Sequence, residues 1–164
     1  MDYSLVEIRY NNIMALRHFL LDGPSAWQPL HGEFRKDDET AAGYVSLLLG
    51  AFSVAVRRRF PPNCDAAEIM RFVTELRISH QDEPGLINPL VAEDVIRHTV
   101  DASPLDDDGS QDLTTVLGIK AHILLYLVAE AGFSDAELDR FIDDVVAYTG
   151  NWLAARRAEM ITQP

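Results

Sequence analysis

Residues 44–56 read YVSLLLGAFSVAV, and residues 113–128 read LTTVLGIKAHILLYLV. In both stretches the apolar side chains point in nearly every direction around a helix of 3.6 residues per turn. A helix that is apolar all round has to be shielded from water, so both are expected to be central helices covered by other helices or by a partner chain. The short alternation of apolar and polar residues that predicts strands is missing from the chain.

Four further segments have a single apolar stripe at helical spacing, which is typical of helices that pack around a core. Together with the two central helices they occupy about 4–21, 37–59, 65–80, 88–100, 110–131 and 134–160. No internal repeat or long linker divides the sequence. We therefore predict an all-α fold, a compact bundle of about six helices with two central, fully apolar helices, in a single domain over residues 1–164.

Helix ends are marked by residues that satisfy the free backbone groups. Asp65 with Glu68, and Ser134 with Glu137, have the spacing of a capping box, in which each side chain accepts a hydrogen bond from the other residue's backbone. Asn88 is expected to cap a helix that has Pro89 in its first turn. Gly23 and Gly132 follow apolar runs and are expected to end helices in the left-handed conformation, as in the turn Asp22-Gly23-Pro24.

Charge and cysteine content narrow the class of protein. The formal net charge is −12, and residues 101–164 contain 12 acids against 4 bases, which disfavours binding to nucleic acid. The single cysteine, Cys64, excludes an internal disulfide and a four-thiolate metal site, and suits a reducing compartment. Cys64 also follows Pro62 and Asn63 and precedes Asp65, so an ordinary loop thiol is expected.

The expected location is the cytoplasm of a bacterium. The N-terminal residues lack the basic and apolar regions of a secretory signal, and the longest charge-free apolar stretch, 44–56, is shorter than the roughly 20 residues of a membrane span. Two lysines against twelve arginines favour a GC-rich bacterial genome. We expect no membrane association.

Two sequence features suggest metal sites, and both are weak. In the run Asp106-Asp107-Asp108-Gly109 the calcium-loop spacing puts Pro104 and Thr115 where carboxylates are required, so a solvated loop beside a helix N-terminus is expected. None of the five histidines has a Glu three residues before it, and no two lie four apart. The sequence leaves open whether one group converges on a metal ion: His80, Asp82, Glu83, Glu93 and His98.

His122 is the most unusual residue, because it lies with Lys120 inside the apolar helix over 110–131. The functional interpretation is an internal ligand pocket lined by His122, Lys120 and Tyr126. The structural interpretation is a core histidine with a hydrogen-bond partner such as Tyr44 or Tyr126, and a lysine whose stem lies along the surface. No cofactor is expected with either interpretation.

The arginine runs 57–59 and 156–157 lie in the last turns of predicted helices, where cations offset the negative end of the helix. An acidic partner or a phosphate is the alternative role for them. Motifs for a nucleophile elbow, a phosphate loop or a dinucleotide site are missing, which favours a non-enzymatic role, although an unfamiliar active site stays open.

The apolar content of the long helices is high for one small chain, and excess apolar surface is commonly buried by association. The sequence thus predicts a regulatory or protein-interaction module that self-associates as a homodimer or binds another protein. One alternative is a helical protein that binds a small molecule in the pocket near His122. A second alternative is an acidic inhibitor or immunity-type protein that neutralises a basic enzyme.

Overall fold

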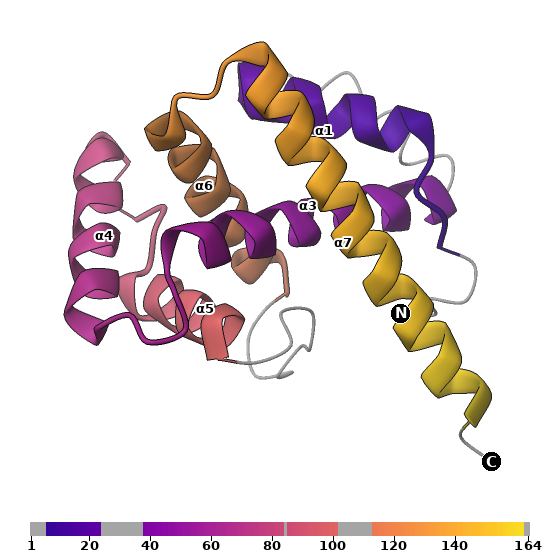
Figure 1. The fold of residues 1–164 in the computed structure, drawn as a ribbon. Coiled ribbons are helices and arrows are strands. Elements are labelled where there is room, and N and C mark those ends of the chain that lie inside the picture. Colours follow the sequence, from indigo (N-terminus) through magenta and orange to yellow (C-terminus); the bar gives the residue numbers. More distant parts are fainter. Residues whose placement is uncertain (1–5, 24–37, 84, 102–112, 163–164) are drawn as a thin grey trace. The chain divides into compact units, whose positions relative to one another are not determined.

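The computed structural model describes residues 6–23, 38–83, 85–101 and 113–162. These residues form helices and no strand, so the predicted all-α fold of about six helices is confirmed (Figure 1). The helices are α1 (Tyr10–Asp22), α3 (Asp38–Arg59), α4 (Ala66–Ser79), α5 (Pro89–Asp101), α6 (Leu113–Ala131) and α7 (Asp135–Thr162). The predicted loop that contains residues 106–109 lies outside the described residues.

The chain divides into two compact units. The first consists of Met1–Ala51 and Phe133–Pro164, and the second of Phe52–Gly132. The division falls inside α3, between Ala51 and Phe52, so one continuous helix contributes to both units. The single domain over residues 1–164 stays a prediction.

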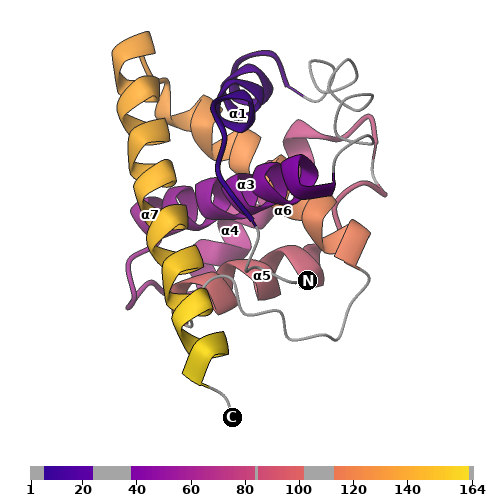
Figure 2. The same cartoon turned by 90° about the vertical axis from the view of Figure 1, so that its right-hand side faces the viewer.

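In the first unit α1 packs against α7 and crosses it near its first turns (Figure 1, Figure 2). Its core contains apolar side chains from α1, α3 and α7: Leu16, Phe19, Tyr44, Leu47, Phe141 and Val145. On the surface of this unit, Arg17 of α1 donates to the Asp139 carboxylate of α7 over 3.1 Å. Such an exposed ion pair adds at most about 1 kcal/mol, so the buried apolar contacts hold the helices together.

The predicted start of the first helix near residue 4 is wrong, because α1 begins at Tyr10. Val6 is only 2% exposed, but it is buried from an extended segment and not from a helix. Asn12 explains the change, since its Oδ1 accepts from the Arg9 backbone N–H (2.9 Å) and its Nδ2 donates to the Thr40 carbonyl of α3 (2.8 Å). A side chain that caps α1 and bonds α3 fixes the helix start by tertiary contact.

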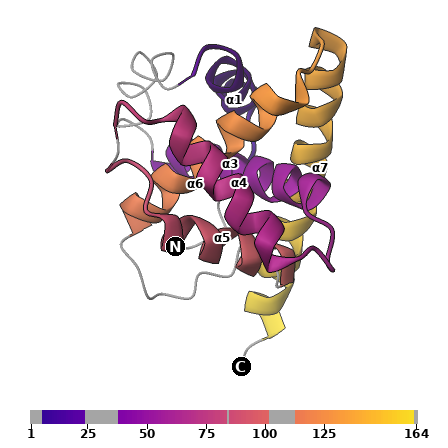
Figure 3. The ribbon, with the colours of Figure 1, turned by 90° about the vertical axis from the view of Figure 1, so that its left-hand side faces the viewer.

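In the second unit α4 packs against α5, and α5 packs against α6 (Figure 3). Rings from α4, from α6 and from the residue after α3 meet in its core, because Phe72 of α4 makes edge-to-face contacts with Phe60 (5.2 Å) and with Tyr126 of α6 (5.5 Å). Such pairs add about 0.5–1.5 kcal/mol each to the burial of the rings. The core of this unit is completed by Phe52, Val56, Leu76, Ile96, Ile123 and Leu124.

Most predicted helix ends are confirmed. Asn88 Oδ1 accepts from the Leu90 N–H (3.1 Å). Of the capping box predicted at Ser134 and Glu137, one half is formed, since Glu137 accepts from the Ser134 N–H (2.9 Å), while the Ser134 hydroxyl donates to the Glu137 carboxylate (2.6 Å). Gly23 and Gly132 have φ of 74° and 58°, as expected for glycines after a helix.

The capping box predicted at the start of α4 is only half formed. Asp65 accepts from the Ala67 N–H (3.1 Å) as an N-cap should. Glu68 instead accepts from Arg59 at the end of α3 (2.6 Å), because a guanidinium is a stronger partner for its carboxylate than a backbone amide. The spacing of residues 65 and 68 does not indicate that Glu68 pairs with an arginine of another helix.

The two apolar helices differ in how far they are covered. By length and composition alone, both helices are long and apolar enough to cross a membrane. In α3, 61% of the apolar stretch is buried inside the protein, whereas in α6 only 22% of the apolar stretch is buried. The buried side of α6 carries Ile119, Ile123, Leu124 and Leu127. Among the described residues α6 is therefore covered mainly on one side, and its shielding on the other side by further residues or by a partner chain stays a prediction. The absence of a membrane span also stays a prediction.

Candidate functional site

Two histidines from different helices meet at one end of α4. His80 follows the last residue of α4, and its ring lies edge-to-face against the ring of His122 on α6, with 5.4 Å between the ring centroids and 74° between the planes. Both side chains are half-buried. We call these two residues the histidine pair.

Each ring of the histidine pair is held by its own helix. His122 Nδ1 lies 2.7 Å from the Gly118 carbonyl, and His80 Nδ1 lies 2.9 Å from the Leu76 carbonyl. A carbonyl only accepts, so both contacts are hydrogen bonds in the tautomer with the hydrogen on Nδ1. His80 Nδ1 also lies 2.9 Å from the Ser79 hydroxyl oxygen. In the neutral imidazole the other nitrogen, Nε2, then keeps its lone pair for a proton or a metal ion.

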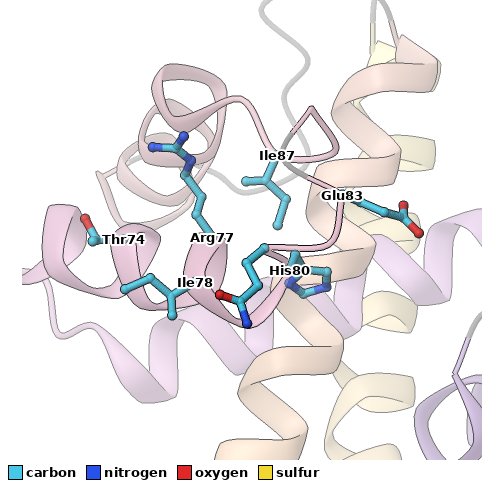
Figure 4. Close-up of a pocket in the computed structure, with 7 residues that line it drawn as sticks. Thr74, Arg77, Ile78, His80, Glu83 and Ile87 are labelled. Carbon is cyan, nitrogen blue, oxygen red and sulfur yellow. The ribbon is translucent and has the colours of Figure 1, made fainter.

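A pocket of about 320 Å³ lies beside His80. It is lined by Thr74, Arg77, Ile78, His80, Gln81, Glu83 and Ile87, and Figure 4 shows the His80 ring on the side next to α6. The Glu83 carboxylate extends away from the other side chains in that view. The volume lies at the lower end of the range for small-molecule sites, which is roughly 300–1,000 Å³.

The three residues of the predicted pocket are not directed to one place. His122 and Tyr126 face α4, where they contact His80 and Phe72. The Lys120 ammonium instead lies 5.5 Å from the centre of the Phe52 ring of α3. The pocket beside His80 is lined by other residues, so the ligand site at His122, Lys120 and Tyr126 stays a prediction.

Within the described part of the chain, no group of three or more His, Cys, Asp or Glu side chains is arranged to hold a metal ion. The five residues that the sequence left open for this role, His80, Asp82, Glu83, Glu93 and His98, therefore do not form such a group. Burial first, and then the nearby carboxylates of Glu68, Asp101 and Asp65, raise the pKa of the Cys64 thiol, which disfavours the reactive thiolate.

Arginines of the two runs, 57–59 and 156–157, contact backbone carbonyls and carboxylates within their own unit. Arg57 donates to the Thr99 carbonyl (3.1 Å), and Arg59 pairs with Glu68 and with Glu130 (3.7 Å). Arg157 donates to the Val6 carbonyl, and Arg156 pairs with Glu159 (3.0 Å). These contacts support a structural role for both runs.

A second candidate surface is the side of α6 that points away from its buried residues. It consists of Leu117, Gly118, Ala121, Leu125 and Val128, all of them half-buried, and we call it the open face of α6. A methyl group added at Gly118 would meet no atom within 4 Å, so there is free space at the middle of this face. The two charged residues of α6 lie elsewhere, with Lys120 on Phe52 and Glu130 beside Arg59.

Sequence reasoning found His122 but missed its partner. His80 and His122 are 42 positions apart, and a contact between them depends on how α4 packs relative to α6.

No family model, no curated protein and no solved structure matches this chain.

Proposed function

We propose that this protein is a non-enzymatic interaction module of the bacterial cytoplasm that self-associates as a homodimer through the open face of α6. The observation that supports this proposal is the low burial of α6. Only 22% of its apolar stretch is buried, compared with 61% of the apolar stretch of α3. An apolar helix face left partly in water is commonly covered by a partner.

The uncharged open face of α6 can accept a second copy, even though the overall charge of two chains opposes their association. Each chain has a formal net charge of −12, so two copies repel each other over most of their surfaces. The open face of α6 has no charged residue among Leu117, Gly118, Ala121, Leu125 and Val128. A basic partner would be attracted to the acidic surface, whereas an uncharged apolar face suits an identical face related by a two-fold axis.

The small residues of the face favour helix-to-helix contact. Gly118 and Ala121 lie three positions apart and therefore on the same side of α6. Small side chains allow two helix axes to approach to about 8 Å, at the close end of the usual range. Leu125 and Val128 would then pack against the same residues of the second copy.

The test is the mass of the protein in solution at micromolar concentration. We expect the wild-type chain to sediment as a dimer and Leu125→Glu to sediment as a monomer with unchanged helix content, because the variant puts two carboxylates into the apolar contact. Leu90→Glu is the matched control, since Leu90 is 75% exposed on α5 and should leave the dimer intact.

Three outcomes would contradict the proposal. They are a monomeric wild type, a dimer that survives Leu125→Glu, and flotation of the wild-type protein with lipid vesicles in place of dimer formation.

Gly118→Ala provides an independent test of the dimer. It should weaken the dimer by crowding the contact, while raising the stability of each chain by up to about 1 kcal/mol.

The pocket beside His80 supports a second candidate, a protein that binds a small molecule. The pocket combines the apolar side chains of Ile78 and Ile87 with the polar groups of Arg77 and His80. Native mass spectrometry of freshly purified protein tests this candidate. A retained molecule lost in Ile87→Ala would support it, and bare protein masses would count against it.

A further inference from the structure

We propose that His80 and His122 form a binding site for a divalent transition-metal ion of the Zn²⁺, Cu²⁺ or Ni²⁺ type, bridging α4 and α6. The site includes no side chain of the open face of α6; it meets that face only at the Gly118 carbonyl, which holds His122. It uses two imidazoles that the packing of the second unit brings together.

The spacing of the two rings fits a shared ion. An ion bound tetrahedrally about 2.0–2.1 Å from one nitrogen of each ring would hold the two ring centroids roughly 5 Å apart. The observed separation of the histidine pair is 5.4 Å. The separation of the two rings is therefore compatible with one shared ion.

The hydrogen bonds of the rings fit the same role. Histidines that bind metals usually donate their other ring N–H to a carbonyl or a carboxylate, which fixes the tautomer and the ring orientation. In His80 and His122 alike, Nδ1 is bonded to a backbone carbonyl of the same helix, at 2.9 Å and 2.7 Å. In the tautomer that makes these bonds, the lone pair of each neutral ring is on Nε2.

The chemistry of the donors selects the class of ion. Imidazole nitrogen suits Zn²⁺, Cu²⁺ and Ni²⁺, whereas Mg²⁺ and Ca²⁺ require oxygen ligands. Among the described residues no third His, Cys, Asp or Glu joins the pair, so water would complete the coordination. Both rings are half-buried, which leaves the ion a path from solvent.

The first test is a calorimetric titration of the untagged full-length chain with Zn²⁺. We expect one ion per chain, and binding at least about tenfold weaker in His80→Gln and in His122→Gln, because even the loss of an outer-shell partner costs roughly 10–100-fold. His18→Gln is the matched control, since His18 lies on α1 with the Asp22 carboxylate at 3.6 Å and should not affect the affinity. Equal affinity in all four proteins, or the absence of Zn²⁺ binding by the wild type, would overturn the proposal.

The second test does not depend on the variants folding. The electron paramagnetic resonance spectrum of Cu²⁺ bound to the wild-type chain should show coupling to two imidazole nitrogens. Coupling to fewer than two would refute the site, whatever the variants do. In a folded His80→Gln protein we expect one nitrogen at most, and an unchanged spectrum would also refute it.

Discussion

At the scale of single residues, Gly43 and Asn12 explain how the extended segment before α1 reaches α3. A methyl group added at Gly43 would lie 2.5 Å from the Glu7 carbonyl oxygen and 2.9 Å from Asn12 Oδ1. Real side chains do not come so close to a backbone oxygen, so α3 needs a glycine here. Asn12 is fully buried and bonded at both ends of its amide, to Arg9 and to Thr40.

Gly43→Ala is therefore expected to lower the free energy of unfolding by about 1–3 kcal/mol, the usual cost of overpacking a site that cannot relax. Gly150→Ala is the control. Gly150 lies within α7 and has open space around it, so the alanine should raise stability by about 0.5–1 kcal/mol. Urea denaturation of the three proteins measures both changes, and a neutral Gly43→Ala would show that the segment at Glu7 is not held against α3.

At the scale of the elements, the start of α7 is stabilised by a charged cap. Ser134 donates through Oγ to the Glu137 carboxylate (2.6 Å) and through its backbone N–H to the same oxygen (2.9 Å). These bonds favour the ionised carboxylate, so they lower the pKa of Glu137 from its ordinary value of 4.5. The cap has no apolar cover, and its strength depends on that charge.

This lowered pKa gives a pH dependence with a definite sign. A carboxyl group with a lowered pKa in the folded protein contributes stability above its unfolded pKa, and that contribution is lost as the pH falls through the folded pKa. The melting temperature of Ser134→Ala should therefore be below that of the wild type at pH 7, and the gap should narrow below about pH 4.5. Thr74→Ala, which removes a hydroxyl bond to the Met70 carbonyl (2.8 Å), should show a gap that does not change with pH. A constant gap in Ser134→Ala would contradict the charged cap.

At the scale of the whole molecule, α3 joins the two units, because the division between Ala51 and Phe52 lies inside it. An α-helix is hydrogen-bonded from each residue to the fourth one before it, so neither part of α3 can unfold without breaking bonds of the other. We expect one cooperative unfolding transition, as in a single domain.

Differential scanning calorimetry tests whether the chain unfolds in one cooperative transition. If it does, the calorimetric enthalpy of unfolding should equal the van't Hoff enthalpy. Hydrogen exchange offers a local measurement, in which backbone amides near Leu47 and near Val56 should be protected to the same degree. Two resolved transitions, or protection that differs sharply across residue 51, would establish two independently folding units.

Local patterns predicted the helices well because their causes are local. Asp65 and Asn88 each accept from an amide two residues further on, Glu137 accepts from the Ser134 amide, and Gly23 and Gly132 have a positive φ directly after a helix. The prediction failed where a distant group intervened. Asn12 starts α1 late by bonding Thr40, and Arg59 takes Glu68 away from the capping box.

The candidate sites depended more on tertiary structure. His122, Lys120 and Tyr126 were selected for being polar groups in an apolar helix, yet the packing directs Lys120 to α3 and the other two residues to α4. Position in one helix specifies the direction of a side chain but not the element it meets. The pairing of His80 with His122 could not be predicted for this reason.

By itself, the amino-acid sequence determined that this chain is helical, where most of its helices begin and end, and that α3 and α6 are its most apolar segments. These properties follow from spacing and capping over a few residues. Only the tertiary structure decided that α3 is largely covered while α6 keeps an open face, and that two histidines 42 positions apart meet. Both depend on which helix surfaces pack together, which is settled by shape and contact between distant segments.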